Sequence, residues 1–335
     1  MPRPAPRNLI TDVPGLTVGC AQDEAVRSGV TVVLCPEGWS AAVDVRGGGP
    51  GVRETETLAP ENSFSRAHAI CLSGGSVFGL GAADGVASIL SSRDVGVRLA
   101  AGSLAIPIVP GAVLHDLANG GDKSWGLDPP YRALGMAAVA AAGQSFELGA
   151  VGAGRGAKAG LVKGGLGSAS IDLGGGLIVG ALVAANPVGS VYMPDGETFW
   201  AWPFEIDGEY GGRIPTGAVS ATEPLPDESK LGAAGRLRTG ANTTLAVIAV
   251  TADLSTAEAK RVAMMAHDGM GRAVRPAHTA FDGDVVFALA SGAVSLGADP
   301  AIRSVEVSRL GSAAADCLAR AIARAVYEAR DFRES

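Results

Sequence analysis

Residues 242–251 read Asn-Thr-Thr-Leu-Ala-Val-Ile-Ala-Val-Thr, a run of apolar and β-branched side chains that opens at two threonines. Because β-branched side chains fit the pleated surface of a sheet, the run predicts a buried strand from Thr243. The preceding positions 202–240 are rich in Pro, Gly and charge, which is typical of an exposed connector. A peptide bond between Asn242 and Thr243 would therefore be accessible on one side and held by a rigid strand on the other.

This junction has the properties expected of a self-cleaving bond. A threonine hydroxyl has no base of its own, but an α-amino group freed at Thr243, with a pKa near roughly 8, could take its proton. Cleavage would begin with attack of the Thr243 hydroxyl on the carbonyl carbon of Asn242 and pass through an ester that water hydrolyses. The alternative is an ordinary polar start to a strand, where threonine is common in any case.

Two further polar groups stand beside predicted strands. Asp282 and Asp284 flank Gly283 before the apolar run 285–289, and residues two apart on a strand share a face, so the two carboxylates could together orient an ammonium. An acidic turn is the alternative for this Asp-Gly-Asp sequence. Asn186 ends another apolar run, where its amide could donate to a developing oxyanion. Taken alone, the pair Asn186-Pro187 is more typical of a turn.

The glycine-rich segment 149–167 carries two lysines, Lys158 and Lys163. Either lysine could bring positive charge to an active site, although solvated loop lysines are more common. The pattern from Gly152 to Ala157, with Asp172 further on, loosely matches a dinucleotide fingerprint. Further glycines interrupt the helix that such a fingerprint requires, so the sequence predicts no dinucleotide site.

Composition limits the class of protein. The 335 residues are 47% hydrophobic and carry a formal charge of −7, without a dense Lys/Arg run, which argues against nucleic acid as a partner. No apolar segment of signal-peptide or membrane-spanning type is present, so we expect a cytoplasmic protein with no membrane partner. No metal is expected, because the histidines lack HxxxH spacing; they are His68, His115, His267 and His278. Attack by a threonine hydroxyl with its own amine as base needs no other cofactor. Scattered cysteines in apolar surroundings suit reduced core thiols.

Strand and helix patterns alternate along the chain. Thr31–Cys35 predicts a buried strand, and a helix is expected after Gly75. Ser255 and Glu258 form a capping box for a helix to about His267 that Gly269 could close. The chain ends in a helix with a regular apolar face, formed by Leu318, Ile322 and Val326. This mixture predicts one domain, 1–335, of layered α+β or α/β architecture.

The motifs together are more specific than any one of them. Eight blocks, in the same order along the chain, carry a resemblance to a known family; they are Ile10–Gly19, Val43–Gly51, His68–Ser76, Gly152–Gly154, Lys163–Ser170, Asn186–Gly189, Asn242–Thr244 and Phe281–Asp284. In these blocks the sequence resembles the peptidase family of the L-aminopeptidase/D-esterases, the β-peptidyl aminopeptidases and the endo-type nylon-oligomer hydrolases. The resemblance implies a four-layer αββα sandwich of the N-terminal-nucleophile-hydrolase type. It further implies autocleavage into an α chain, 1–242, and a β chain, 243–335, and assembly into homo-oligomers of tetrameric or larger size.

The resemblance also assigns roles to individual residues. Thr243 corresponds to the nucleophile. In having threonine at this position, the sequence resembles the nylon-oligomer-hydrolase subgroup. Asn186 corresponds to the active-site asparagine, and Asp282 and Asp284 to the pair that positions the nucleophile and its amine. Lys163 is our choice for the family's lysine, with Lys158 as runner-up. His115 stands where relatives can have an oxyanion-stabilising tyrosine, and the oxyanion or substrate pocket would include it with Gly74 and Gly75.

The function expected from the sequence is hydrolysis of a small peptide or amide by a self-processed enzyme with an N-terminal threonine. The acyl-threonine intermediate could instead be intercepted by an amine, which would make the protein an acyltransferase. A homologue that kept the fold and lost turnover would be a binding protein.

Overall fold

The computed structural model describes residues 3–217, 223–234 and 242–330. The strands in this part of the chain are β1 (Thr17–Asp23), β2 (Ser28–Val45), β3 (Gly51–Arg53), β4 (Arg66–Ser73), β5 (Gly111–Val113), β6 (Lys158–Ala159), β7 (Val162–Lys163), β8 (Gly165–Asp172), β9 (Ile178–Asn186), β10 (Thr243–Ala252) and β11 (Val285–Val294). The α-helices are α1 (Ala82–Ser92), α2 (Tyr131–Ala140), α3 (Lys230–Ala234), α4 (Thr256–Ala273) and α5 (Pro300–Ala329). Short 3₁₀ turns lie at Ile10–Asp12, Thr55–Leu58, Ser76–Gly81, Gly152–Gly154 and Trp202–Phe204.

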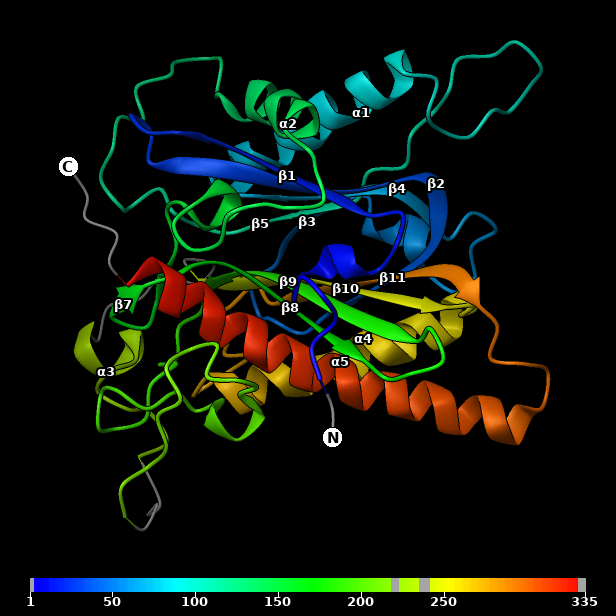
Figure 1. The fold of residues 1–335 in the computed structure, drawn as a ribbon. Helices are drawn as coiled ribbons and strands as arrows, with labels where there is room; N and C mark the ends of the chain where they lie inside the picture. The colour runs from blue at the N-terminus through cyan, green and yellow to red at the C-terminus, as the bar shows by residue number, and fades with distance from the viewer. Residues whose placement is uncertain (1–2, 218–222, 235–241, 331–335) are drawn as a thin grey trace.

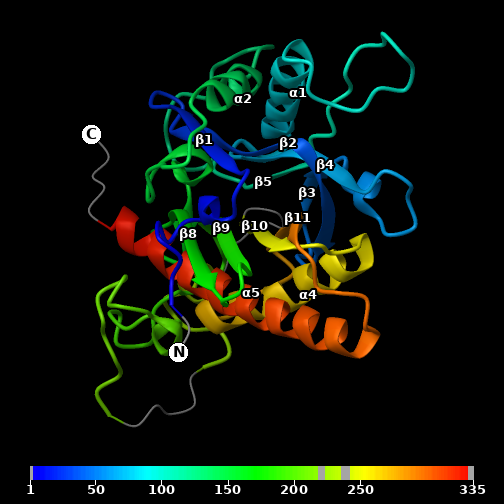
Figure 2. The same ribbon diagram turned by 45° about the vertical axis from the view of Figure 1, so that its right-hand side comes forward.

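Strand β2 is the element that organises the sheet. The nine-stranded sheet has the order β3-β5-β4-β2-β11-β10-β9-β8, with β1 also paired to β2. The first part of β2 pairs with β4 and its last part, Ser40–Val45, pairs with β11, with an irregularity in the β4 register between Leu34 and Trp39. The sheet therefore folds over at β2 and forms two layers, seen one above the other in Figure 1 and from a second direction in Figure 2.

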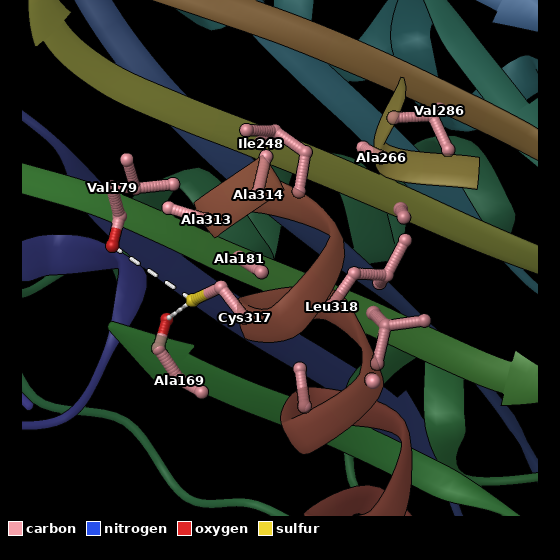
Figure 3. Close-up of a cluster of buried hydrophobic side chains, with 14 of the residues drawn as sticks. Ala169, Val179, Ala181, Ile248, Ala266, Val286, Ala313, Ala314, Cys317 and Leu318 are labelled. Atoms are coloured by element: carbon pink, nitrogen blue, oxygen red, sulfur yellow. Dashed lines mark hydrogen bonds between the residues drawn. The ribbon is translucent and has the colours of Figure 1, made fainter. Parts of the chain in front are cut away.

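Three buried clusters fill the spaces between four layers. One lies between helices α1 and α2 and the outer face of β2 and β4, and a second lies between the two sheet layers, with Val33, Leu182, Val247 and Phe287 among its members. The third lies under α4 and α5, which cover β8 to β11. Figure 3 shows α5 in this cluster, where the Cys317 thiol donates to the carbonyl oxygen of Ala169 at 3.0 Å. The predicted αββα sandwich is confirmed.

Helix α4 begins where the sequence predicted it and ends later. The capping box of Ser255 and Glu258 is present, and the side chain of Ser255 accepts from the N–H of Glu258. The expectation that Gly269 closes the helix is wrong, because α4 continues to Ala273. A Cβ at position 269 would lie 2.2 Å from the carbonyl oxygen of Ala315, so this glycine allows α4 and α5 to pack closely.

The remaining local expectations have mixed outcomes. Leu318, Ile322 and Val326 are buried, as the apolar face of α5 predicted, and all four cysteines are free thiols. Most described positions of the segment 202–240 are exposed or half-buried, although Tyr210 and Ser229 are buried. Positions 218–222 and 235–240 lie outside the described residues. No helix in the described ranges is long and apolar enough to cross a membrane.

Candidate active site

The ends of three neighbouring strands bring the predicted site residues together. Thr243 opens β10 and is the register partner of Asn186, the last residue of β9. On the other side of β10, Asn242 forms a parallel bridge with Asp282, just before β11. Asn186 and Thr243 therefore lie together at the ends of their strands, next to the acidic residues that precede β11, as the resemblance implied.

The Asn242–Thr243 peptide bond is buried and its carbonyl group accepts two hydrogen bonds. The backbone N–H of Gly283 donates to Asn242 O at 2.9 Å, and the Thr243 hydroxyl donates to the same oxygen at 2.5 Å. A Cβ on residue 283 would lie 2.6 Å from Thr243 Oγ, so only glycine lets the backbone donor approach this closely. A hydroxyl nucleophile thus lies beside a carbonyl whose oxygen already has a backbone donor, the arrangement that stabilises an oxyanion.

The two aspartates make different contacts. Asp284 Oδ1 accepts from the N–H of Thr244 at 2.8 Å, which fixes the residue after the nucleophile. Asp282 accepts from the N–H of Val188 at 3.0 Å and from both the N–H and the hydroxyl of Thr279. Burial, together with the charge of Asp284, raises the pKa of the Asp282 carboxyl to about 6. One of the pair can therefore change its charge near neutral pH.

His278 completes the surroundings of Asp284. Its Nδ1 lies 2.7 Å from Asp284 Oδ2, and its backbone N–H reaches the same oxygen. Burial opposes a charge on the ring, but the hydrogen bond and charge of Asp284 outweigh it and raise the pKa of His278. Its ring packs edge-on against His267, whose pKa burial lowers to about 4. No spacing pattern in the sequence marks His278 as a partner of Asp284.

Asn186 is held by three groups. Its Nδ2 donates to the carbonyl oxygen of His115 at 3.2 Å, and its Oδ1 accepts from the backbone N–H of Lys158 at 2.9 Å. The third contact, at 3.4 Å, comes from the ammonium of Lys230. Lys163 pairs with Lys158 across the β6–β7 hairpin. The pKa of Glu24 is lowered mainly by its hydrogen bond from Arg155, and the positive charge of Lys163 lowers it further.

The side chain of Lys230 contacts the predicted site residues. Besides Asn186, its Nζ donates to Asn242 Oδ1 at 2.6 Å and to the carbonyl oxygen of Lys158 at 2.8 Å. Burial lowers its pKa to about 7, although the charge of Asp282 acts in the opposite direction. Sequence reasoning missed this residue because it lies in the segment expected to be an exposed connector, and no spacing pattern marks it.

A cavity of about 170 Å³ opens onto this group of residues, lined among others by His115, Asp116, Lys158, Asn186, Lys230 and Asn242. Gly75 donates its N–H to Asp116 Oδ1 at 2.8 Å, and a Cβ on Gly74 would lie 2.3 Å from Asp116 Oδ2. The two glycines thus support the wall of the cavity through Asp116. Larger hollows of about 340 and 420 Å³ lie around Cys20 and Tyr192, and the predicted catalytic residues are not among the residues that line them.

The chain is similar over most of its length to known proteins. An uncharacterized aminopeptidase of Mycobacterium tuberculosis (strain H37Rv) is 46% identical over 338 residues, covering 96% of this chain and 94% of the relative. A 6-aminohexanoate-oligomer endohydrolase of Kocuria sp. (strain KY2) is 31% identical, covering 94% of this chain and 84% of the relative.

Solved structures show the same fold. A β-aminopeptidase of Burkholderia sp. matches with a TM-score of 0.66 and 26% identity, over 97% of this chain and 88% of that one. An L-aminopeptidase D-Ala-esterase/amidase of Ochrobactrum anthropi, described as a variant of the Ntn hydrolase fold, matches with a TM-score of 0.70 and 20% identity, over 98% of this chain and 88% of that one. The model of peptidase family S58 matches residues 8–335. The chain belongs to peptidase family S58, and it is a hydrolase acting on peptide or amide bonds.

Proposed function

We propose that the protein is the precursor of a self-processing amide hydrolase whose nucleophile is Thr243. The observation that carries the proposal is the position of the Thr243 hydroxyl, 2.5 Å from the carbonyl oxygen of Asn242, while Gly283 donates to that same oxygen. An intact peptide bond placed against its own nucleophile and a backbone donor is the starting arrangement for an N-to-O acyl shift.

Self-cleavage proceeds in two steps. Thr243 Oγ attacks the carbonyl carbon of Asn242, negative charge develops on Asn242 O, and the N–H of Gly283 stabilises that charge. The C–N bond then breaks, the nitrogen of Thr243 takes the hydroxyl proton, and an ester joins Asn242 to Thr243 Oγ. Water hydrolyses this ester, which leaves a carboxylate on Asn242 and a free amine and hydroxyl on Thr243.

Turnover of an external amide repeats the same chemistry. The free amine of Thr243 accepts the hydroxyl proton as Oγ attacks the substrate carbonyl, and returns it to the leaving amine. Asp282 and Asp284 stand beside the start of β10, where their charge stabilises the ammonium form during transfer. The second N–H of the Asn186 amide and the N–H of Gly283 are the donors for the oxyanion. Water then releases the acyl group from Thr243.

The class of amide is proposed from relatives. The aligned proteins are described as aminopeptidases, a β-aminopeptidase and a 6-aminohexanoate-oligomer endohydrolase. These names have in common the hydrolysis of an amide bond, and the cavity of about 170 Å³ beside Asn242 has room for a short acyl group. We therefore propose short linear amides as substrates, with no cofactor taking part in the steps above.

Isosteric variants of two buried threonines on β10 test the proposal. Thr243→Val removes only the nucleophilic hydroxyl, and we expect it to abolish both self-cleavage and hydrolysis of p-nitroanilides. Thr251→Val is the matched control at the opposite end of the strand, where the hydroxyl donates to Gly176 O, and it should still cleave itself. Trapping the acyl enzyme with hydroxylamine should place the acyl group on Thr243 in the wild type. A Thr243→Val protein that still hydrolysed amides would contradict the assignment.

A further inference from the structure

The precursor is its own first substrate, and Asn242 is the acyl group of that substrate. The side chain of Asn242 therefore occupies the place that the acyl side chain of a later substrate takes when Thr243 attacks it. In this position Asn242 Oδ1 accepts a hydrogen bond of 2.6 Å from Lys230 Nζ. Among the described residues its Nδ2 has no hydrogen-bond partner, so the contact recognises the oxygen of the amide and not its nitrogen.

Lys230 is anchored by contacts that do not involve the scissile bond. Its backbone N–H donates to Val188 O at 3.0 Å, and the neighbouring Glu228 accepts from the N–H of Leu161 at 3.2 Å. Ser229, between them, is fully buried and its hydroxyl donates to Pro226 O. Since Val188 and Leu161 lie outside the connector, these contacts give Lys230 a fixed place before and after cleavage.

The ammonium of Lys230 has three oxygen partners in the precursor, Lys158 O, Asn186 Oδ1 and Asn242 Oδ1. The first two belong to the body of the protein and the third departs when the acyl group leaves Thr243. Leaving a buried N–H without a partner costs more free energy than an ordinary hydrogen bond contributes. Hydrogen bonds that involve a charged group are stronger than those between neutral groups. A substrate that restores the third oxygen is therefore favoured, and one that places an ammonium there is repelled.

We propose that Lys230 determines the acyl specificity of this site, and that the preferred acyl groups carry a neutral carbonyl oxygen on the third carbon beyond the reacting carbonyl carbon, as asparagine does. The inference rests on the proposed function of Thr243. A neutral carbonyl is favoured over a carboxylate because the charge of Asp282 already acts on Lys230. The substrate class is thus the succinamoyl or asparaginyl-type amide.

The direct test compares two p-nitroanilides of the same shape. Succinamoyl p-nitroanilide has the required carbonyl, and 4-methylpentanoyl p-nitroanilide replaces the carboxamide by an isopropyl group. We expect the cleaved wild-type protein to prefer the succinamoyl compound by at least about tenfold in kcat/KM, as expected for one hydrogen bond to a charged group. Lys230→Met should bring the ratio to within about twofold of one, by lowering only the succinamoyl rate. A wild-type ratio of one or below, or an unchanged ratio in Lys230→Met, would overturn the inference.

A matched lysine separates specificity from general charge. Lys158→Met should keep the wild-type ratio, because Lys158 reaches Asn186 through its backbone N–H and Lys230 through its backbone carbonyl. Loss of the preference in Lys158→Met as well as in Lys230→Met would show that pocket charge alone sets it, against the inference.

Self-cleavage gives a second measurement that needs no external substrate. Asn242→Leu removes the oxygen that Lys230 binds, so Asn242→Leu and Lys230→Met should each slow fragment formation by about tenfold or more, and the double variant should be no slower than either. Additive slowing would contradict the contact. A protein that cleaves itself with these effects but hydrolyses no amide would contradict the proposed function while leaving the role of Lys230 in place. A wild type that never cleaves would contradict both.

Discussion

The backbone N–H of Gly283 donates to the carbonyl oxygen of Asn242 at 2.9 Å, and this bond joins the turn before β11 to the bond that we propose is cut. The glycine is required because a Cβ at 283 would lie 2.6 Å from Thr243 Oγ and 2.8 Å from Gly49 O. The glycine-rich segment that follows β2 thus holds Gly283 against the nucleophile, and Gly49 N in turn donates to Asp282 O at 2.8 Å.

Gly283→Ala should therefore block self-cleavage while leaving the fold largely intact. The added methyl group displaces either Thr243 Oγ or the backbone donor, and loss of one oxyanion donor costs about 10²–10³ in rate in comparable sites. Fragment formation, followed by intact mass, should fall by at least about tenfold. Thermal unfolding of the same sample is the control, and a variant that unfolds like the wild type yet cleaves at the wild-type rate would remove Gly283 from the mechanism.

The raised pKa of Asp282 predicts a pH dependence for amide turnover. Burial and the charge of Asp284 hold the Asp282 carboxyl protonated below about pH 6, and a neutral carboxyl gives the Thr243 ammonium no charge stabilisation. The rate should rise as pH increases through about 6. Asp282→Asn should be slower and should lack this rise. An inflection that persists in Asp282→Asn would mean that another group titrates there.

A buried ionic cluster connects the two chains that cleavage would produce. Arg320 and Arg324 of α5 contact Glu209, and Arg320 also donates to Asn8 Oδ1 at 2.9 Å. Removing Glu209 leaves two arginine charges without their carboxylate, so Glu209→Ala should lower the free energy of unfolding by about 3–5 kcal/mol.

A surface pair gives the matched control for Glu209. Glu197 pairs with Arg213 where both side chains are more than half exposed, at 64% and 59%. Exposed pairs contribute about 0–1 kcal/mol, so Glu197→Ala should have little effect in the same urea titration. Equal effects of Glu197→Ala and Glu209→Ala would show that the buried cluster adds no particular stability.

Two glycines on α4 offer a second matched pair. Gly269→Ala would press a methyl group against Ala315 O at 2.2 Å, and overpacking of this kind costs about 1–3 kcal/mol. At Gly271 nothing lies within 4 Å of the added Cβ, and alanine favours a helix by about 1 kcal/mol, so Gly271→Ala should be stabilising. Thermal unfolding of both variants checks the α4–α5 contact, which would be refuted if Gly269→Ala were as stable as Gly271→Ala.

Local patterns predicted the fold well where the physical cause is local. The β-branched run of β10 and the capping box at Ser255 depend on neighbouring residues, and both are confirmed. The length of β2 and its crossing between the two layers depend on which strands pair with it, and the sequence indicated only Thr31–Cys35. Gly269 was misread as a helix end for the same reason, since only the approach of α5 explains it.

The site divides in a similar way. Thr243, Asn186, Asp282 and Asp284 could be proposed from motif resemblance, and the strand register brings them together. The roles of Lys230 and of the Gly283 N–H could not be predicted from the sequence. Lys230 lies in a segment without a periodic pattern, and the Gly283 donor is a backbone group. Their roles follow from where the chain places them in space and not from their residue type.

Time-resolved intact mass spectrometry of the purified uncleaved chain tests the central claim most directly. The account predicts that the full-length mass disappears and that a fragment of residues 243–335 appears with a free amine on Thr243, in the wild type but not in Thr243→Val. A wild-type chain that remains whole after prolonged incubation, or a cut at any other bond, would contradict Thr243 as the nucleophile.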